Sequence, residues 1–128
     1  MKRVTGIGGA FFKARDTKAL AAWYDKHLGL SFGENGYHVF FWDEDPKPDT
    51  RGTTVFSMFK QETKYFEPST NAFMFNLRVE NLDWLLQTLR DEGVQVMEQT
   101  ENMEGVGKFG WIMDPEGNKI ELWEPAKA

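Results

Sequence analysis

The sequence contains no cysteine, only two histidines and no long hydrophobic run. Without cysteine, disulfide bonds, thiolate metal sites and cysteine nucleophiles are excluded. No segment approaches the roughly 20 apolar residues that a membrane-spanning helix needs, and the N-terminus shows no signal peptide, so we expect a cytoplasmic location. Positive charge is also in deficit. The net charge of -5 argues against a nucleic-acid or anionic-membrane partner.

Aromatic side chains, in contrast, are abundant. They make up 15% of the 128 residues, with eleven Phe and five Trp, whereas the hydrophobic (41%) and charged (27%) fractions are those of an ordinary globular domain. The length suits one domain. This aromatic area is more than a small core needs, so it is compatible with an aromatic-lined pocket that binds a small molecule.

The first half of the chain, about residues 4–60, predicts a strand, a helix and three further strands. Asp16 is suited to cap the N-terminus of the helix with its carboxylate, and Gly29 is suited to end it in a left-handed conformation. Apolar residues recur at helical spacing between them. The expected elements are, in order, residues 6–14, 18–28, 30–32, 37–42 and 53–59, with a loop at 43–52.

The second half, about residues 71–125, repeats this order after a linker at about 61–70. Asn81 is the expected N-cap of the second helix, and Gly93 follows its end as Gly29 follows the first. Leucines at 82, 85, 86 and 89 form the apolar stripe of this helix. The expected elements are residues 72–79, 82–92, 94–97, 107–113 and 119–124, with a turn at 114–118.

Two tandem β-α-β-β-β modules of this kind predict a single α+β domain over residues 1–128. One helix covers one face of each module's sheet, so neither module can bury both faces alone. When the two sheets join and curve, their uncovered faces line a shared trough. The sequence therefore predicts a curved mixed sheet around that trough. It leaves open whether one chain or a dimer completes the trough, and we expect a homodimer.

Two segments carry a resemblance to a known family. The segment "ARDTKALAAWYDKHLGL" in the first module and "DPEGNKIELWEP" at the end of the second are similar to the vicinal oxygen chelate superfamily. That superfamily includes glyoxalase I, extradiol dioxygenases and bleomycin resistance proteins. The resemblance covers nearly the whole chain and implies the same fold. It does not imply one particular activity.

The resemblance also implies a role for Glu121, which lies between two aliphatic residues on the last strand. In metal-dependent members an acidic residue at this place binds a divalent cation together with His, Gln or Glu on the first strand of each module. Those partner positions fall here at Gly9 and Met74, and the first-module counterpart of Glu121 falls near Ser57. Gly and Met do not bind hard cations. Glu121 is therefore the only candidate metal ligand, and we expect no metal bound in the familiar way.

Strand alternation predicts which residues line the trough. Four apolar residues of the strand 72–79 should pack under the second helix, namely Phe73, Phe75, Leu77 and Val79. The residues expected to face the trough are Gly9, Phe11, Lys13, Val55, Ser57, Phe59, Met74, Asn76, Arg78, Glu121 and Trp123. His38 is included as the only histidine on a plausible trough-facing strand, although a hydrogen-bonded role within the sheet is the simpler reading. The segment 103–108, with two glycines, is a candidate flap.

Two functions remain open at this stage. The first is a protein that binds a small molecule in the trough without metal, where Glu121 would be a counter-charge for a cationic ligand and the aromatic rings would stack on it. The alternative is a metal-dependent lyase or dioxygenase of the same superfamily, with Glu121 as metal ligand or, in a desolvated pocket, as general base. Nothing in the sequence supports a third interpretation, in which the trough is closed and the protein serves only in assembly.

Overall fold

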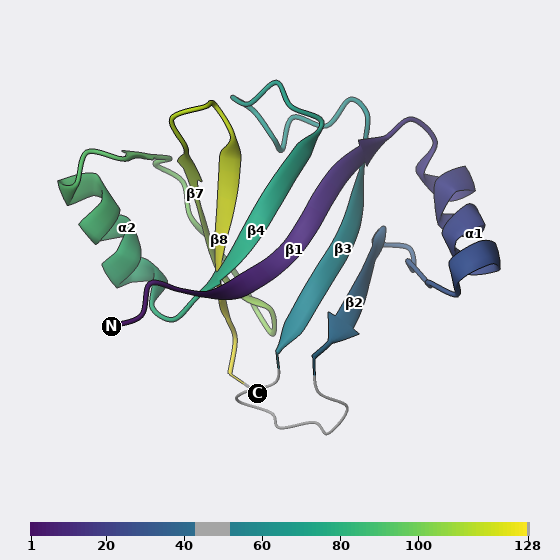
Figure 1. Ribbon diagram of the computed structural model, residues 1–128, viewed down its shortest axis with the longest axis horizontal. Coiled ribbons are helices and arrows are strands. Elements are labelled where there is room, and N and C mark those ends of the chain that lie inside the picture. Colours follow the sequence, from purple (N-terminus) through teal and green to yellow (C-terminus); the bar gives the residue numbers. More distant parts are fainter. Residues whose placement is uncertain (43–51, 128) are drawn as a thin grey trace.

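The computed structural model describes residues 1–42 and 52–127 of the chain (Figure 1). The first half contains β1 (Val4–Ala14), α1 (Thr17–Leu28), β2 (Tyr37–Phe41) and β3 (Thr53–Lys60). The second half contains β4 (Phe73–Val79), α2 (Leu82–Asp91), β5 (Gln95–Val96), β6 (Glu101–Met103), β7 (Gly107–Met113) and β8 (Lys119–Pro125).

All strands belong to one sheet of eight strands in the order β2-β3-β1-β4-β8-β7-β5, with β6 paired to β7. The halves meet where β1 pairs with β4 in the antiparallel direction. Within each half one pair is parallel, β1 with β3 and β4 with β8, and the remaining pairs are antiparallel. The predicted α+β class with a mixed sheet is therefore confirmed.

The strand register shows that the two halves are structural repeats. In the first half Phe11 lies opposite Ser57 on a parallel neighbour, and in the second Asn76 lies opposite Glu121 in the same way. The two halves run through β1-β3-β2 and β4-β8-β7 from the centre of the sheet outward. Glu121 and Ser57 are thus equivalent positions, as the sequence spacing predicts.

Both helices begin and end within one residue of the predicted bounds. The Asp16 carboxylate accepts a hydrogen bond from the Ala19 amide (3.0 Å), and the Asn81 side chain accepts one from the Trp84 amide (3.1 Å). These bonds satisfy amides that have no partner inside the helix. Gly29, at φ 68°, ends α1 in the left-handed region, where a side chain would be strained.

The helices cover the two ends of the sheet and leave its middle bare (Figure 1). Leucines 82, 85 and 86 of α2 are buried against Val79 and Leu122. The other end has a core of three buried residues beside α1, namely Ala14, Phe32 and Met58. A third cluster lies away from both helices and consists of Phe11, Phe66, Met74 and Trp111.

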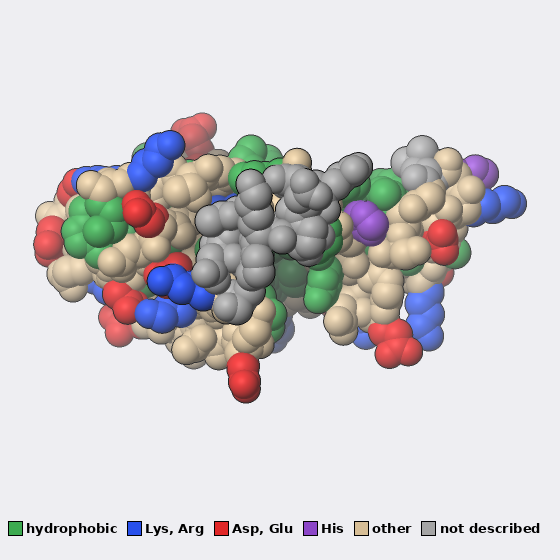
Figure 2. Space-filling view, turned by 90° about the horizontal axis from the view of Figure 1, so that it is seen from below, with side chains coloured by type: hydrophobic (Ala, Val, Ile, Leu, Met, Phe, Trp, Pro, Cys, Tyr) green, Lys and Arg blue, Asp and Glu red, His purple; other side chains and the backbone are tan. Residues whose placement is uncertain are grey.

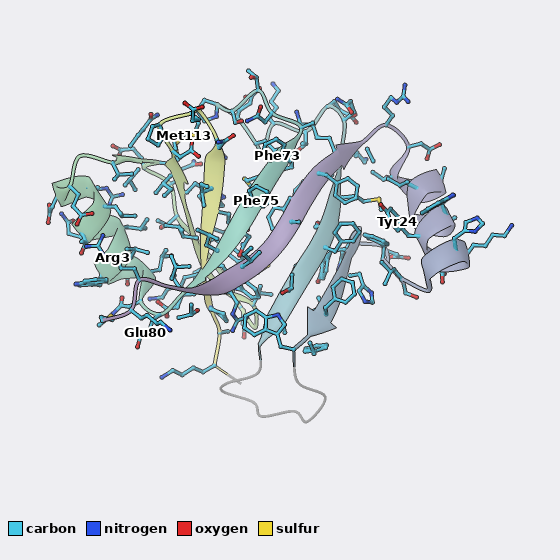
Figure 3. The ribbon with its side chains drawn as sticks, viewed as in Figure 1. Arg3, Tyr24, Phe73, Phe75, Glu80 and Met113 are labelled. Carbon is cyan, nitrogen blue, oxygen red and sulfur yellow. The ribbon has the colours of Figure 1, made fainter. Side chains whose placement is uncertain are left out.

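The prediction that Phe73 and Phe75 pack under the second helix is wrong. Their exposed fractions are 42% and 46%, and of that face only Leu77 and Val79 join the α2 cluster. Figure 3 shows both phenylalanines on β4 between the two helices. Strand alternation gave the right face of the sheet, but α2 reaches only the end of β4 that leads into it. Trp23, one of the apolar residues of α1, is likewise half exposed.

Two strand predictions also need correction. Residues 30–32 form no strand, because Phe32 turns into the α1 core and its carbonyl accepts from the Tyr37 amide in a tight turn. The short strand β6 was not predicted, and it forms a hairpin with β7. The predicted loop at 43–52 lies outside the described residues except for Gly52.

Within the described part of the chain, neither helix is long and apolar enough to cross a membrane. The face shown in Figure 2 carries acidic and basic side chains interspersed, with no large patch of one sign among the residues described there.

Truncating a buried leucine of α2 tests the assignment of the helix face. Leu85→Ala or Leu86→Ala should lower the free energy of unfolding by about 2–5 kcal/mol, because each change leaves a cavity in the cluster around Leu122. Urea denaturation measures the change. The matched control is Gln87→Ala on the exposed side of the same helix, which should stay within about 0.5 kcal/mol of the wild type. Equal effects at all three positions would contradict the assignment.

Candidate functional site

The concave side of the sheet encloses a trough of about 460 Å³ that draws on both halves of the chain. Its walls come from seven strands, β2, β3, β1, β4, β8, β7 and β6, and from the β6–β7 turn, the residue after β8 and the segment before β4. Six aromatic residues line it: Phe11, Tyr37, Phe59, Tyr65, Phe109 and Trp123. The polar lining consists of Thr53, Ser57, Asn76, Arg78 and Glu121. The trough is thus mainly apolar, with a few polar groups at fixed places.

Glu121 is held in the wall of the trough by three donors. Its Oε2 accepts hydrogen bonds from the Tyr65 hydroxyl (2.5 Å) and the Trp111 indole Nε1 (2.9 Å). Its Oε1 accepts from Asn76 Nδ2 (2.6 Å). The side chain is only 2% exposed. A buried carboxylate needs such donors, since an unpaired one would cost several kcal/mol.

The sheet register brings two of these donors to Glu121. Parallel pairing of β4 with β8 places Asn76 beside Glu121, and antiparallel pairing of β7 with β8 places Trp111 opposite it. Tyr65 comes from the segment between the two halves. Its backbone carbonyl accepts from Lys119 Nζ (2.6 Å), so this lysine holds the segment close to the network. We call Glu121, Tyr65, Asn76 and Trp111 the carboxylate network.

A glycine makes room for the network. A Cβ atom at Gly8 would lie 1.9 Å from the Asn76 side-chain oxygen, far inside contact distance. The Asn76 amide therefore fits beside β1 only because residue 8 has no side chain. Its Oδ1 is buried and accepts no hydrogen bond from any residue that the structure describes. Asn76 thus commits its amide nitrogen to Glu121 and leaves one acceptor unused.

Burial is the largest influence on the pKa values of Glu121 and Tyr65, the two ionisable residues of the network. Desolvation raises the pKa of the Glu121 carboxyl above its ordinary value, although the three hydrogen bonds and the charge of Lys119 act in the opposite direction. Burial also raises the pKa of the Tyr65 phenol, and the charge of Glu121 adds to that effect. Tyr65 consequently keeps its proton and remains a donor to Glu121.

The donor set does not fit the divalent cation that the family resemblance implies. Both oxygens of Glu121 already face N–H or O–H hydrogens, which would oppose a cation at the same place. Gly9 and Met74, at the expected partner positions, offer no ligating side chain, and Ser57 offers only a hydroxyl. The described residues contain no group of three His, Cys, Asp or Glu close enough to hold a metal ion.

The structure brings most of the expected trough residues together. Phe11, Ser57, Asn76, Arg78, Glu121 and Trp123 all line the cavity, as do Val55 and Phe59.

Four of the residues expected in the trough are not part of its lining, namely Gly9, Lys13, Met74 and His38. Met74 is on the concave side but fully buried under Phe66 and Trp111, so it does not reach the cavity. His38 points away from it, toward the carbonyl of Ser31 (3.1 Å), because β2 presents Tyr37 and Val39 to the trough instead. The error for His38 is one of strand face: neighbouring residues of a strand point to opposite sides of the sheet, so Tyr37 and Val39 face the trough and His38 does not.

Tyr65 is the functional residue that sequence reasoning missed. The segment 61–70 reads as a linker because of its polar and turn-forming residues. The available signal was the aromatic pair Tyr65 and Phe66 within it: Phe66 is buried at 1% exposure, and Tyr65 stacks on Phe59 with ring centres 5.3 Å apart. The segment 103–108 was expected only as a flap, and three of its residues, Met103, Gly105 and Val106, line the trough.

Comparison with known proteins gives one family match. The model of a family described as "Glyoxalase-like domain" matches residues 9–123. No curated protein sequence matches the chain.

Several solved structures share the fold. Methylmalonyl-CoA epimerase from Mycobacterium tuberculosis is 20% identical with a TM-score of 0.60, over 98% of this chain and 91% of that one. The 2,3-dioxygenase LapB from Pseudomonas sp. KL28 is 20% identical with a TM-score of 0.62, over 100% of this chain and 43% of the dioxygenase. A glyoxalase/bleomycin resistance protein/dioxygenase superfamily member from Vibrio splendidus 12B01 is 10% identical with a TM-score of 0.56, over 90% of this chain and 95% of that one. At these identities the likeness shows the fold alone.

Replacing Glu121 separates its hydrogen bonds from its charge. Glu121→Leu should lower the free energy of unfolding by at least about 2 kcal/mol, because Asn76 and Trp111 would be left buried without acceptors. Glu121→Gln keeps an acceptor for Trp111 and should cost clearly less. This corrects the sequence-based expectation that Glu121 meets only ligand or water. Urea denaturation of both variants measures the difference, and equal losses would contradict the network.

The same variants should differ in pH dependence. Because the folded pKa of Glu121 is raised, the folded state binds its proton more tightly than the unfolded state, whose value is near 4.5. Wild-type stability should therefore fall relative to Glu121→Gln as pH rises from 4.5 through the folded pKa. A wild type that gains stability against Glu121→Gln over this interval would show that the hydrogen bonds outweigh desolvation.

Proposed function

The chain belongs to the Glyoxalase-like domain family, and we propose that its trough binds one small, partly apolar organic molecule. The family assignment agrees with the resemblance to the vicinal oxygen chelate superfamily, so that expectation is confirmed. The observation that carries the proposal is a trough of about 460 Å³ with six aromatic residues and few polar ones. Sites for small organic ligands have this volume and this kind of lining.

The aromatic walls favour a flat ligand. Phe59 and Tyr65 form one stacked pair, and Phe109 and Trp123 form another with rings inclined by only 3°. Both pairs line the trough, so flat rings border it on opposite sides of the β1–β4 seam. Aromatic side chains bind apolar rings by burial of area and by offset stacking.

The proposed role of Glu121 is to position other groups. Its oxygens accept from three protein donors and its side chain is almost fully buried, so it is poorly placed to pair with a cationic ligand. The carboxylate instead fixes the Tyr65 ring and the Asn76 amide, both of which line the trough. A preorganised wall reduces the entropy that binding must overcome.

One structural neighbour is described with a bound small molecule. It is a methylmalonyl-CoA epimerase of Streptomyces coelicolor with a TM-score of 0.66 and 16% identity, in complex with 2-nitronate-propionyl-CoA. That ligand belongs to the epimerase. For this chain the likeness supports the binding of a small molecule, and no reaction is assigned.

Binding of a neutral fluorescent probe tests the proposal. N-phenyl-1-naphthylamine should bind in one-to-one stoichiometry, with its fluorescence raised by the apolar trough. Ser57→Phe, which adds a ring between Phe11 and Tyr37 on the trough side, should weaken binding by about tenfold or more.

A matched control separates the trough from the exposed convex face. Phe75→Ala removes an aromatic ring outside the trough and should leave the affinity of the probe unchanged. Loss of binding in Phe75→Ala but not in Ser57→Phe would place the probe on the convex face and contradict the proposal.

We propose in addition that the chain forms a homodimer through the convex face. Phe73 and Phe75 are exposed there on β4, between the two helices (Figure 3). Ile7 is exposed on the paired strand β1, opposite Leu77. Exposed apolar groups that gather in this way are typical of protein interfaces. A second copy of the chain would cover them.

Sedimentation velocity tests the dimer. The wild type should sediment as a dimer and Phe75→Glu as a monomer, because a charge in a buried contact would have no partner. Trp23→Glu, at an exposed aromatic residue on α1, is the matched control and should remain dimeric. A monomeric wild type at micromolar concentration would refute the interface.

A further inference from the structure

Arg78 places a positively charged guanidinium group in the lining of the trough. Its guanidinium carbon lies 5.3 Å from the centre of the Trp42 ring and 5.3 Å from the centre of the Trp123 ring. Nη1 donates to Thr53 Oγ1 at 3.1 Å. The side chain is half-buried and lines the cavity. Two indoles and one hydroxyl therefore hold the guanidinium in place.

Both indoles are themselves fixed. The Trp42 ring rests where Gly6 and Gly52 have no side chains, since Cβ atoms there would lie 2.8 Å and 2.0 Å from it. Its Nε1 donates to Thr54 Oγ1 at 2.6 Å. The Trp123 Nε1 donates to the Val106 carbonyl at 2.9 Å, and its ring stacks on Phe109. The two indole rings that contact Arg78 are therefore each held by other parts of the protein.

The charge of Arg78 has no acidic partner among the residues described. The ion pairs found there join Arg3 to Glu92 and Lys108 to Asp83 only, and no carboxylate of the described residues lies within 4.0 Å of Arg78. Glu121 is on the neighbouring strand, but its oxygens are taken by the carboxylate network. An arginine remains protonated even when half-buried. The charged group that the described walls offer to a ligand is therefore a cation.

We propose that Arg78 is the carboxylate-binding residue of the trough, and that the ligand is a small, flat organic acid; this rests on the proposed function above. The guanidinium has five N–H groups, and the hydrogen bond to Thr53 uses one of them. The remaining N–H groups match the two oxygens of a carboxylate. This reverses the expectation of a cationic ligand.

The spacing on β4 indicates how such an acid lies. Asn76 and Arg78 are two residues apart on one face of the strand, which corresponds to about 7 Å. A carboxylate at Arg78 thus places a ring-sized body over Phe11 and Val55, and its far end beside the carboxylate network. The network would meet the neutral end of the ligand.

Two probes that differ only in charge test the proposal. Quenching of tryptophan fluorescence measures the affinities of 1-naphthoate and of its neutral isostere 1-naphthamide. The wild type should bind the acid about tenfold or more tightly than the amide. In Arg78→Gln the acid should lose about tenfold in affinity, while the amide changes by less than about threefold. Lys13→Gln removes a cation outside the trough lining and should preserve the preference for the acid.

The outcomes separate the two proposals. If acid and amide bind the wild type equally, or if Arg78→Gln keeps the preference, the role of Arg78 is refuted while small-molecule binding stands. If neither naphthoate, naphthamide nor N-phenyl-1-naphthylamine binds, the proposed function itself fails, and this inference fails with it. The comparison of acid with amide in the wild type decides the question even if Arg78→Gln does not fold.

Discussion

A buried carboxylate is the constraint on which the arrangement of the trough depends. Glu121 is on the concave side of the sheet, where it is 2% exposed, so its oxygens must be paired within the protein. The partners come from three separate segments: Asn76 on β4, Trp111 on β7 and Tyr65 before β4. The carboxylate therefore fixes the segment between the two halves against the sheet of the second half.

This arrangement divides the trough into two chemically different parts. One wall is satisfied by its own hydrogen bonds, with the charge of Glu121 offset by three donors and by Lys119 nearby. Two residues further along β4, Arg78 presents a positive charge between two indoles. The apolar lining that the first half contributes consists of Phe11, Val39, Val55 and Phe59. Selectivity for an acid would follow from this asymmetry, with no metal required to bind it.

The sequence predicts the fold well because its signals are local or repeated. The caps at Asp16 and Asn81 and the alternation along β4 and β8 all hold in the structure. The errors concern relations between distant segments. Alternation assigns Phe73 to a face of the sheet but cannot say how far α2 extends over it. No periodicity predicts that Tyr65 turns back to Glu121, since that contact joins residues 56 positions apart.

The central claim is that Glu121 is paired by protein donors rather than held open for a ligand or cation. Hydrogen exchange of the indole N–H of Trp111, followed by NMR on protein labelled with ¹⁵N, tests this most directly. The account predicts that the Trp111 N–H exchanges far more slowly than that of Trp84, whose ring is partly exposed, and that Glu121→Leu removes this protection. Rapid exchange at Trp111 in the ligand-free wild type would contradict the account.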